Sequence, residues 1–366
     1  MDISLYAEQV KAYFPGVAAR VVENLNGTQN VQQRSYRHLK MLRKVYSPDL
    51  KWASLTTVNG SAVAADVIAM DSSIPLKTRD SLGGATGDVP KIAMEMALRE
   101  KQLTDLDIIA RNPNQNAQLL SRLFNDTVRC ITGVFERLEY MFLQGLSTGL
   151  TTHVDPNNVG LGIRIDYGYL TANKFGTVGA VWAGNPATAT PLTDLARLQN
   201  KATADGNVII RYMMDRPTFN AMIATNEVKQ EVAAAIGFFG ATIPAPTLAQ
   251  VNQATAAKYG WTIELVERSI VTEKDGVRTT RTPWAAGQIV GITDENVGTL
   301  TWGTLAEMNH PVDKVNYTTV QEYILLAKYR ENRPSLAEFT SSQALVIPVI
   351  DNVNGVYTLD TTTVQA

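Results

Sequence analysis

This chain has few of the side chains that usually build a reactive site. Its 366 residues include one cysteine and three histidines. The single Cys130 excludes a framework of intrachain disulfides. His38, His153 and His310 lie far apart in the sequence, and none belongs to a metal-binding motif such as H-E-x-x-H or C-x-x-C. We therefore expect no metal site and no bound cofactor.

An excess of charge of one sign and long apolar runs are also absent. Lys and Arg number 33 and Asp and Glu number 35, so no overall field favours nucleic acid or an anionic membrane. No apolar run reaches the roughly 18 residues of a membrane span, and the first residues lack the basic segment of a secretory signal. With 45% hydrophobic residues, we expect a soluble chain that buries a sizeable core in two subdomains.

Motifs for phosphate binding and covalent catalysis are missing or out of context. Gly160-Leu161-Gly162 lacks the third glycine and the following helix of a dinucleotide-binding loop, and no P-loop occurs. Residues 145–149 match the G-x-S-x-G pattern of serine hydrolases, but that motif needs a strand before the serine. A helix is predicted before Ser147, so we favour a helix C-cap. A serine hydrolase that uses Ser147 remains an alternative of a different class.

The clearest positive signal is a long amphipathic helix over residues 112–144. Asn112 suits the N-cap, Pro113 suits the first turn, and Gly145 is expected to end the helix. One face is wholly apolar and holds Leu120, Leu123, Phe124, Ile131, Val134, Phe135, Leu138, Met141 and Phe142. A helix of about 30 residues is roughly 45 Å long, which is more typical of a building block than of a catalyst.

Other side chains of this helix have ordinary structural interpretations. Cys130 lies near the apolar face and is expected to be a small buried hydrophobe rather than a reactive thiol. Asp126, Glu136 and Glu139 lie beside arginines on the polar face, where we expect solvated or interfacial ion pairs.

Residues 60–98 indicate a two-stranded ribbon with a charged, glycine-rich tip. Apolar residues alternate with the period of half-buried strands at Ala65, Val67 and Ala69, and again at Ile92, Met94, Met96 and Leu98. A ribbon of two strands is marginal in water, so we expect this one to lie on a neighbouring subunit.

The remaining segments alternate between helix and strand. Helices are predicted over 1–15, 34–47, 192–205, 218–235 and 247–259, and strands over 160–168, 207–214, 288–293, 298–303, 320–330 and 336–350. Asp275-Gly276 predicts a hairpin that joins 261–272 to 277–283. This pattern favours an α+β fold with two lobes.

The order of these elements resembles that of tailed-phage major capsid proteins of the HK97-like fold, in particular the lambda E-type branch. The ribbon precedes the long helix, as the family's extended E-loop precedes its spine helix. Residues 142–149 are similar to the end of that helix, and residues 208–217 with Val228-Lys229 to a strand-turn-helix of the A-domain. Residues 258–263 and a C-terminal run through Pro334, Gln343 and Pro348 extend the likeness.

The resemblance implies five segments. They are an N-terminal arm at 1–59, the E-loop at 60–98, a P-domain with its spine helix at 99–185, an A-domain at 186–330, and a return to the P-domain at 331–366. The E-loop would cross a neighbouring subunit, and its candidate contact residues are Lys77, Arg79, Asp80, Gly83 and Gly84.

The resemblance also implies a structural protein rather than an enzyme. It would self-assemble into the hexamers and pentamers of an icosahedral phage head around double-stranded DNA, with assembly in the host cytoplasm. Scaffolding, portal and decoration proteins are the further partners expected, and no membrane is involved. An encapsulin-like compartment that stores protein cargo is a close alternative, and a tail or baseplate subunit is another.

Residues 34–44 form a basic segment with no acidic residue. It holds Arg34, Arg37, Lys40, Arg43 and Lys44. One copy would bind a polyanion weakly, but many copies on the inner surface of a shell would add. No base-reading module is visible, so contact with packaged DNA would be independent of sequence. A solvated helix face or a contact with an acidic partner is the simpler alternative.

Overall fold

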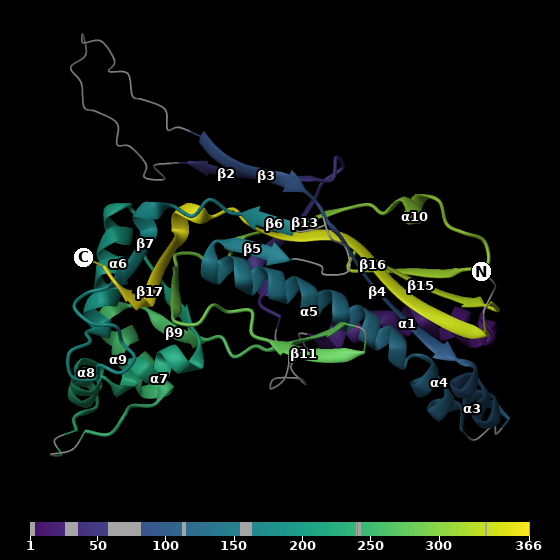
Figure 1. Ribbon diagram of the computed structural model, residues 1–366, viewed down its shortest axis with the longest axis horizontal. Coiled ribbons are helices and arrows are strands. Elements are labelled where there is room, and N and C mark those ends of the chain that lie inside the picture. Colours follow the sequence, from purple (N-terminus) through teal and green to yellow (C-terminus); the bar gives the residue numbers. More distant parts are fainter. Residues whose placement is uncertain are drawn as a thin grey trace, which may run out of the picture. The chain divides into compact units, whose positions relative to one another are not determined.

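A computed structural model of the chain (Figure 1) describes residues 4–25, 36–57, 82–111, 115–153, 163–238, 240, 243–274, 276–333 and 335–365. Its internal contacts divide the chain into two compact units. Unit 1 comprises residues 1–52, 87–140 and 299–349, and unit 2 comprises residues 53–86, 141–298 and 350–366. The described parts contain both helices and β-sheets, which confirms the α+β class.

Unit 1 is organised around one long strand, β16 (Ala337–Ile350). β15 (Ile324–Glu331) and β4 (Lys91–Arg99) both pair with it in antiparallel register. The sheet continues through β13 (Gly298–Gly303) to β1 (Leu42–Tyr46) on one side and ends at β14 (Asn316–Val320) on the other. Most of β16 is buried, as expected for a strand with neighbours on both edges. The predicted strands at 336–350, 298–303 and 92–98 are therefore confirmed.

The predicted long helix is present with different bounds. α4 (Asn116–Leu123) and α5 (Asn125–Thr148) replace the single helix expected over 112–144. Only Phe124 separates them, and its N–H still donates to Leu120 O at 3.0 Å, so the break in hydrogen bonding is slight. The remaining helices of this unit are α1 (Ala7–Leu25), α2 (His38–Met41), α3 (Glu100–Ala110) and α10 (Ala306–Asn309).

The apolar face of α5 lies on β16. The Cys130 S–H donates to Thr340 O at 3.3 Å, and the Ser342 hydroxyl donates to Cys130 O at 3.0 Å. Burial raises the pKa of the Cys130 thiol to about 12, which leaves it protonated and unreactive at neutral pH. The interpretation of Cys130 as a small buried hydrophobe is confirmed.

Two predictions near the N-terminus are wrong. Pro15 does not end the first helix, because Val10, Phe14 and Ala18 recur every four residues and are all buried, so packing keeps α1 helical through Pro15. The helix expected over 34–47 shrinks to α2, and β1 follows at once. The edge of the sheet supplies backbone partners there, and the Ser47 N–H donates to Trp302 O at 2.8 Å. Tertiary hydrogen bonding has thus overridden the helical pattern.

Unit 2 contains a second large sheet, which combines parallel and antiparallel pairs. Its strand order is β7 (Lys174–Thr177), β17 (Val356–Val364), β12 (Gln288–Ile292), β8 (Arg211–Met214) and β9 (Thr262–Leu265). α6 (Pro191–Ala204), α7 (Arg216–Ala224), α8 (Asn226–Ile236) and α9 (Leu248–Tyr259) contribute to its hydrophobic core. The rings of Tyr212 and Trp261 meet edge-on within that core, with centroids 4.9 Å apart.

Several details of unit 2 correct the predicted boundaries. The helix expected over 218–235 is two helices, because Thr225 is extended and lies between α7 and α8. The strand expected over 261–272 is likewise two. β9 pairs in parallel with β8, whereas β10 (Ile270–Lys274) forms the predicted hairpin with β11 (Val277–Arg281). β5 (Leu150–His153) pairs with β6 (Ile163–Asp166), and short 3₁₀ turns occupy Thr171–Asn173 and Val353–Gly355.

The ribbon predicted over 60–98 pairs differently. β2 (Lys51–Thr57) pairs with β3 (Leu82–Asp88), whereas the strand at 91–99 joins the sheet of unit 1 through β16. The glycine-rich stretch therefore belongs to a strand and not to the tip of a ribbon. The alternating residues Ala65, Val67 and Ala69 lie outside the described residues.

The long helix ends later than predicted. Gly145 lies inside α5, where a Cβ would come within 2.6 Å of Cε2 of Tyr167, so close packing requires glycine there. Gly149, with φ +74°, follows the last helical residue, and its N–H donates to Gly145 O at 2.7 Å. The left-handed conformation of Gly149 ends the helix.

We predict that Gly149→Ala destabilises the protein more than Gly168→Ala does. Both glycines have positive φ, which costs an alanine roughly 1–2 kcal/mol. A Cβ at Gly149 would also lie 2.8 Å from Cγ of Tyr169, whereas a Cβ at Gly168 meets nothing within 4 Å. The clash adds about 1–3 kcal/mol. Denaturant unfolding of both variants measures the difference, and equal losses would contradict the packing argument.

Candidate functional site

A buried acid–histidine pair anchors the basic segment to α5. The ring N–H at Nδ1 of His38 donates to Oε2 of Glu139 at 2.6 Å, and both side chains have no exposed surface. The backbone N–H groups of Arg37 and His38 donate to the same carboxylate at 3.0 and 3.1 Å. Tyr36 is buried beside them, and its hydroxyl donates to Glu136 at 3.0 Å. One carboxylate therefore fixes the backbone at residues 37 and 38.

The environment of Glu139 determines its ionisation. Burial by itself raises the pKa of the carboxyl group. The hydrogen bond and charge of His38, together with the two backbone N–H donors, lower this pKa by more than burial raises it. The net pKa lies below the ordinary value, so Glu139 is ionised at neutral pH. Nε2 of His38 is also buried and has no hydrogen-bond partner among the described residues.

The expectation that Glu139 is a solvated or interfacial residue is wrong. It lies on α5 four residues after Phe135 and four before Leu143, both of which are fully buried. That spacing places the carboxylate beside the apolar face. An acid with buried neighbours on both sides needs an internal partner, and His38 was the available candidate.

We predict that Glu139→Gln lowers the free energy of unfolding at pH 7 by about 3–5 kcal/mol, as for other broken buried pairs. Folding lowers the pKa of Glu139, so its contribution is present above the carboxyl pKa of the unfolded chain, about 4.3, and is lost as the pH falls through the folded value. The variant should therefore lose stability less steeply on acidification. Glu100→Gln, an exposed acid on α3, is the control. Parallel pH profiles for wild type and Glu139→Gln would contradict the assignment.

The basic side chains themselves are spread over two elements. Lys40 is exposed on α2, and Arg43 and Lys44 are exposed on β1, while Arg37 is partly buried. Lys44 Nζ donates to Gln321 Oε1 at 2.5 Å and lies 5.8 Å from the ring centroid of Tyr323. The structure therefore does not form the single basic helix face that the sequence pattern predicted. Arg34 lies outside the described residues.

The candidate E-loop residues are only partly described. Gly83 and Gly84 lie in the backbone of β3, whereas Lys77, Arg79 and Asp80 lie outside the described residues. At the base of this segment, the Val89 N–H donates to Leu50 O at 2.8 Å. Gly87 is required by close approach, since a Cβ there would lie 2.8 Å from Nε1 of Trp52.

The Ser147 hydroxyl is buried and hydrogen-bonded within the protein. Ser147 lies within α5 with 1% of its surface exposed, and its hydroxyl donates to Leu143 O at 3.0 Å. It also accepts the N–H of Ala285 at 3.1 Å. A nucleophile elbow requires a strand before the serine, and here the preceding residues are helical. The serine hydrolase alternative therefore lacks its structural basis.

A second buried ion pair joins β15 and β16. Lys328 Nζ is 3.4 Å from Oε1 of Glu338, and neither side chain has exposed surface. Lys328 also donates to Leu123 O and to the Thr340 hydroxyl, both at 3.2 Å, and the Ser4 hydroxyl donates to Glu338 at 2.6 Å. Burial lowers the pKa of Lys328, against the opposing effect of Glu338. These hydrogen bonds connect Ser4 and the last residue of α4 to the sheet of unit 1.

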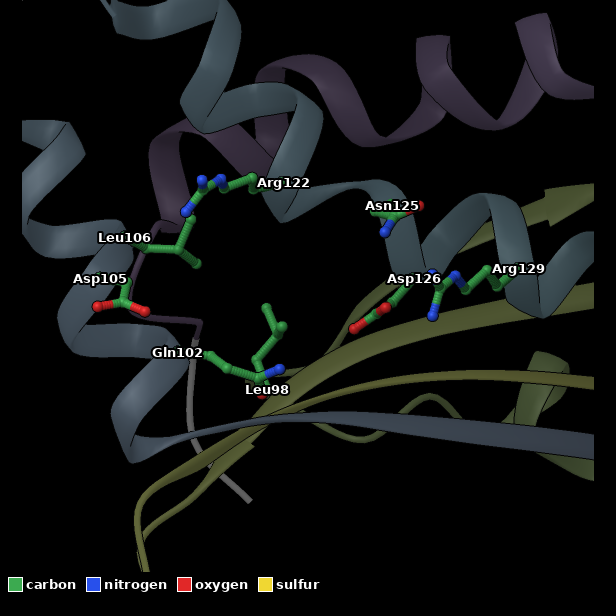
Figure 2. Close-up of a pocket in the computed structure, with 8 residues that line it drawn as sticks. All are labelled: Leu98, Gln102, Asp105, Leu106, Arg122, Asn125, Asp126 and Arg129. Carbon is green, nitrogen blue, oxygen red and sulfur yellow. The ribbon is translucent and has the colours of Figure 1, made fainter. Parts of the chain in front are cut away.

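One pocket of unit 1 is lined by charged side chains of both signs (Figure 2). Its volume is about 280 Å³. The lining residues are Leu98 from β4; Gln102, Asp105 and Leu106 from α3; Arg122 from α4; and Asn125, Asp126 and Arg129 from α5. Asp126 is 7% exposed, and Figure 2 shows its carboxylate directed into the open space.

Other kinds of site were sought among the described residues. No group of three His, Cys, Asp or Glu side chains is positioned to hold a metal ion there. Within the same residues, no helix combines the length and apolar character needed to cross a membrane.

Solved structures with a similar fold include a prophage protein of E. coli CFT073 described as a capsid protein. The TM-score is 0.51 at 13% identity, over 77% of this chain and 79% of that chain. The capsid of an empty GTA particle gives a TM-score of 0.47 at 14% identity, with 90% of each chain covered. The SrpI encapsulin of Synechococcus elongatus PCC 7942 gives 0.40 at 12% identity, over 95% and 97% of the chains. The fold is that of HK97-like phage capsid proteins.

The family match agrees with the fold. A model of the family described as phage major capsid protein E matches residues 79–358. This chain therefore belongs to the phage major capsid protein E family and is a structural protein of the phage virion. Curated protein sequences give no significant match. The predicted resemblance to the lambda E-type branch is confirmed.

Proposed function

We propose that this capsid protein assembles into the hexamers and pentamers of an icosahedral phage head that encloses double-stranded DNA. The match to the capsid family over residues 79–358 carries the proposal. We further propose that assembly takes place in the host cytoplasm, with scaffolding, portal and decoration proteins as partners. The P-domain and A-domain divisions at 99–185 and 186–330 belong to the same proposal.

Among the described residues, each of the two larger sheets has outer strands on which such assembly can depend. β1 and β14 are the outer strands of the main path in the first sheet, and β7 and β9 are the outer strands of the second. Edge strands of soluble monomers are usually covered or shortened, because their free N–H and C=O groups pair readily with other chains. In a shell subunit, neighbouring copies supply that cover.

We assign the residues between β2 and β3 to the intersubunit E-loop. These two strands form a sheet of their own, and a two-stranded sheet is marginal in water without support. Contact with a neighbouring subunit would supply that support. Lys77, Arg79 and Asp80 are the proposed contact residues within it.

Replacing residues 60–80 by an Asn-Gly turn should leave a folded subunit that no longer forms closed shells. The design keeps β2 and β3 intact, so that the loss is confined to the intervening segment. Circular dichroism checks the fold, and size-exclusion mass with electron microscopy checks assembly. Intact particles from the shortened protein would refute the E-loop assignment.

We also propose that Lys40, Arg43 and Lys44, with Arg34 and Arg37, face the packaged genome. The first three are exposed, and the backbone before them is fixed by Glu139, so every copy presents them in the same way. Each phosphate contact releases counterions, and repetition over many subunits multiplies a weak effect.

Lys40→Glu with Arg43→Glu should permit empty shells but reduce their DNA content, because reversed charges repel phosphate. Lys101→Glu, an exposed lysine on α3, is the matched control. The ratio of absorbance at 260 and 280 nm and nuclease-protected DNA length measure filling. Wild-type DNA content in the double variant would refute the genome-facing role, and a protein cargo in wild-type particles would refute genome enclosure.

A further inference from the structure

Both outer strands of the large sheet in unit 2 have backbone groups that side chains of the same chain bind. That sheet ends at β9 on one side and at β7 on the other (Figure 1). The N–H and C=O groups of an outer strand are the groups to which a strand of another chain can add. Their contacts therefore bear on which surfaces of the subunit can pair with other copies.

Asn252 of α9 takes the place of a neighbouring strand at β9. Its Oδ1 accepts the N–H of Ile263 at 2.7 Å, and its Nδ2 donates to Ile263 O at 2.9 Å. An antiparallel neighbour bonds in the same way, since it directs one acceptor and one donor at the same residue. On its other side β9 pairs with β8. Ile263 therefore has no need of a further strand.

The outer strand β7 is bound in a similar way by two side chains acting together. The N–H of Gly176 donates to Oε1 of Gln365 at 3.1 Å, and Gly176 O accepts from Nη1 of Arg197 at 3.1 Å. Nη2 of Arg197 donates to the same Gln365 oxygen at 2.9 Å. At the start of the strand, the N–H of Lys174 donates to Thr171 O.

These contacts do more than anchor neighbouring segments to the sheet. Any single polar contact would serve for anchoring, whereas each edge has a donor and an acceptor matched to the N–H and C=O of one residue. The outer strand β1 of the first sheet is different. Four of its five residues are exposed, among them Val45 and Tyr46.

We infer that Asn252, and Arg197 together with Gln365, determine the pairing specificity of the subunit by closing the second sheet to strands of other copies. Of the outer strands on which the proposed assembly can depend, β7 and β9 are then closed from within the chain. Strand pairing between copies at the two larger sheets is confined to the first sheet. The inference rests on the proposed function, because an assembling subunit meets many copies of itself and gains from excluding wrong pairings.

Asn252→Ala opens the β9 edge in the full chain. The unassembled variant should self-associate about tenfold faster than the wild type by light scattering, the factor that about one added interchain hydrogen bond supplies. Gln253→Ala removes an exposed amide from the next position of α9 and should match the wild type. Each protein is measured at the same interval below its own melting temperature, so that lost stability does not enter the comparison.

Hydrogen exchange at Ile263 separates edge closure from anchoring. The wild-type amide is bonded to Asn252 and should exchange slowly. In monomeric Asn252→Ala the amide should exchange rapidly, and association should protect it again because a strand of another copy binds it. Anchoring alone predicts rapid exchange in both states. Association without renewed protection, or association no faster than that of Gln253→Ala, would overturn the inference at β9.

Two variants of Gln365 test the β7 edge and decide the inference if Asn252→Ala does not fold. Gln365→Glu keeps an oxygen that can accept from Gly176 and Arg197, so this variant should match the wild type. Gln365→Ala removes that oxygen and should associate faster by the same measurement. Equal association of the two variants would overturn closure at β7.

The inference and the proposed function fail in different ways. If the wild-type protein forms no closed particle, the proposed function fails, while the measurements on the unassembled subunit still decide the edges. If wild-type particles form, and Asn252→Ala and Gln365→Ala assemble equally well with no rise in association, only the edge inference fails.

Discussion

The structure of unit 1 depends on the need to satisfy a carboxylate buried in an apolar surface. Glu139 lies among buried side chains on α5, and it can remain ionised there only because His38 and two backbone N–H groups donate to it. That requirement fixes residues 37 and 38 against the helix. β1 follows α2 directly in the chain, so the three exposed basic residues of these two elements lie close in sequence to the backbone that Glu139 holds.

The overall charge of the chain is nearly balanced, but the charged side chains are unevenly distributed over the fold. The formal net charge is −2, which would suggest no particular electrostatic partner. The fold gathers exposed basic side chains on α2 and β1, and places two acids and two arginines around one pocket between α3, α4 and α5. Net charge therefore says little about this chain, because the local charge of each surface is set by which segments the fold brings together.

Patterns that depend on neighbouring residues were predicted well. The apolar period of α5, the helix predicted over 247–259 and the Asp275-Gly276 hairpin depend on local signals, and the structure confirms them. Errors arose where distant segments competed for the backbone. The pattern around Pro15 predicted the end of a helix, but packing of Phe14 and Ala18 keeps α1 helical beyond it. The pattern of residues 42–46 predicted a helix, but hydrogen bonding to the edge of a sheet makes them a strand. The partner of β4 is β16, more than two hundred residues later, and no local signal specifies it.

The sequence by itself determined the α+β class, the long amphipathic helix, the likeness to phage capsid proteins and the structural role of Cys130, because these follow from periodicity, composition and element order. Only the tertiary structure decided that Glu139 is buried with His38, that Ser147 is helical and inaccessible, and that Asp126 lies nearly buried at a pocket also lined by arginines. The reason is physical. Whether a charged side chain is solvated, paired or left for a partner depends on which distant segments cover it, and sequence spacing records only what lies within a few turns of the same element.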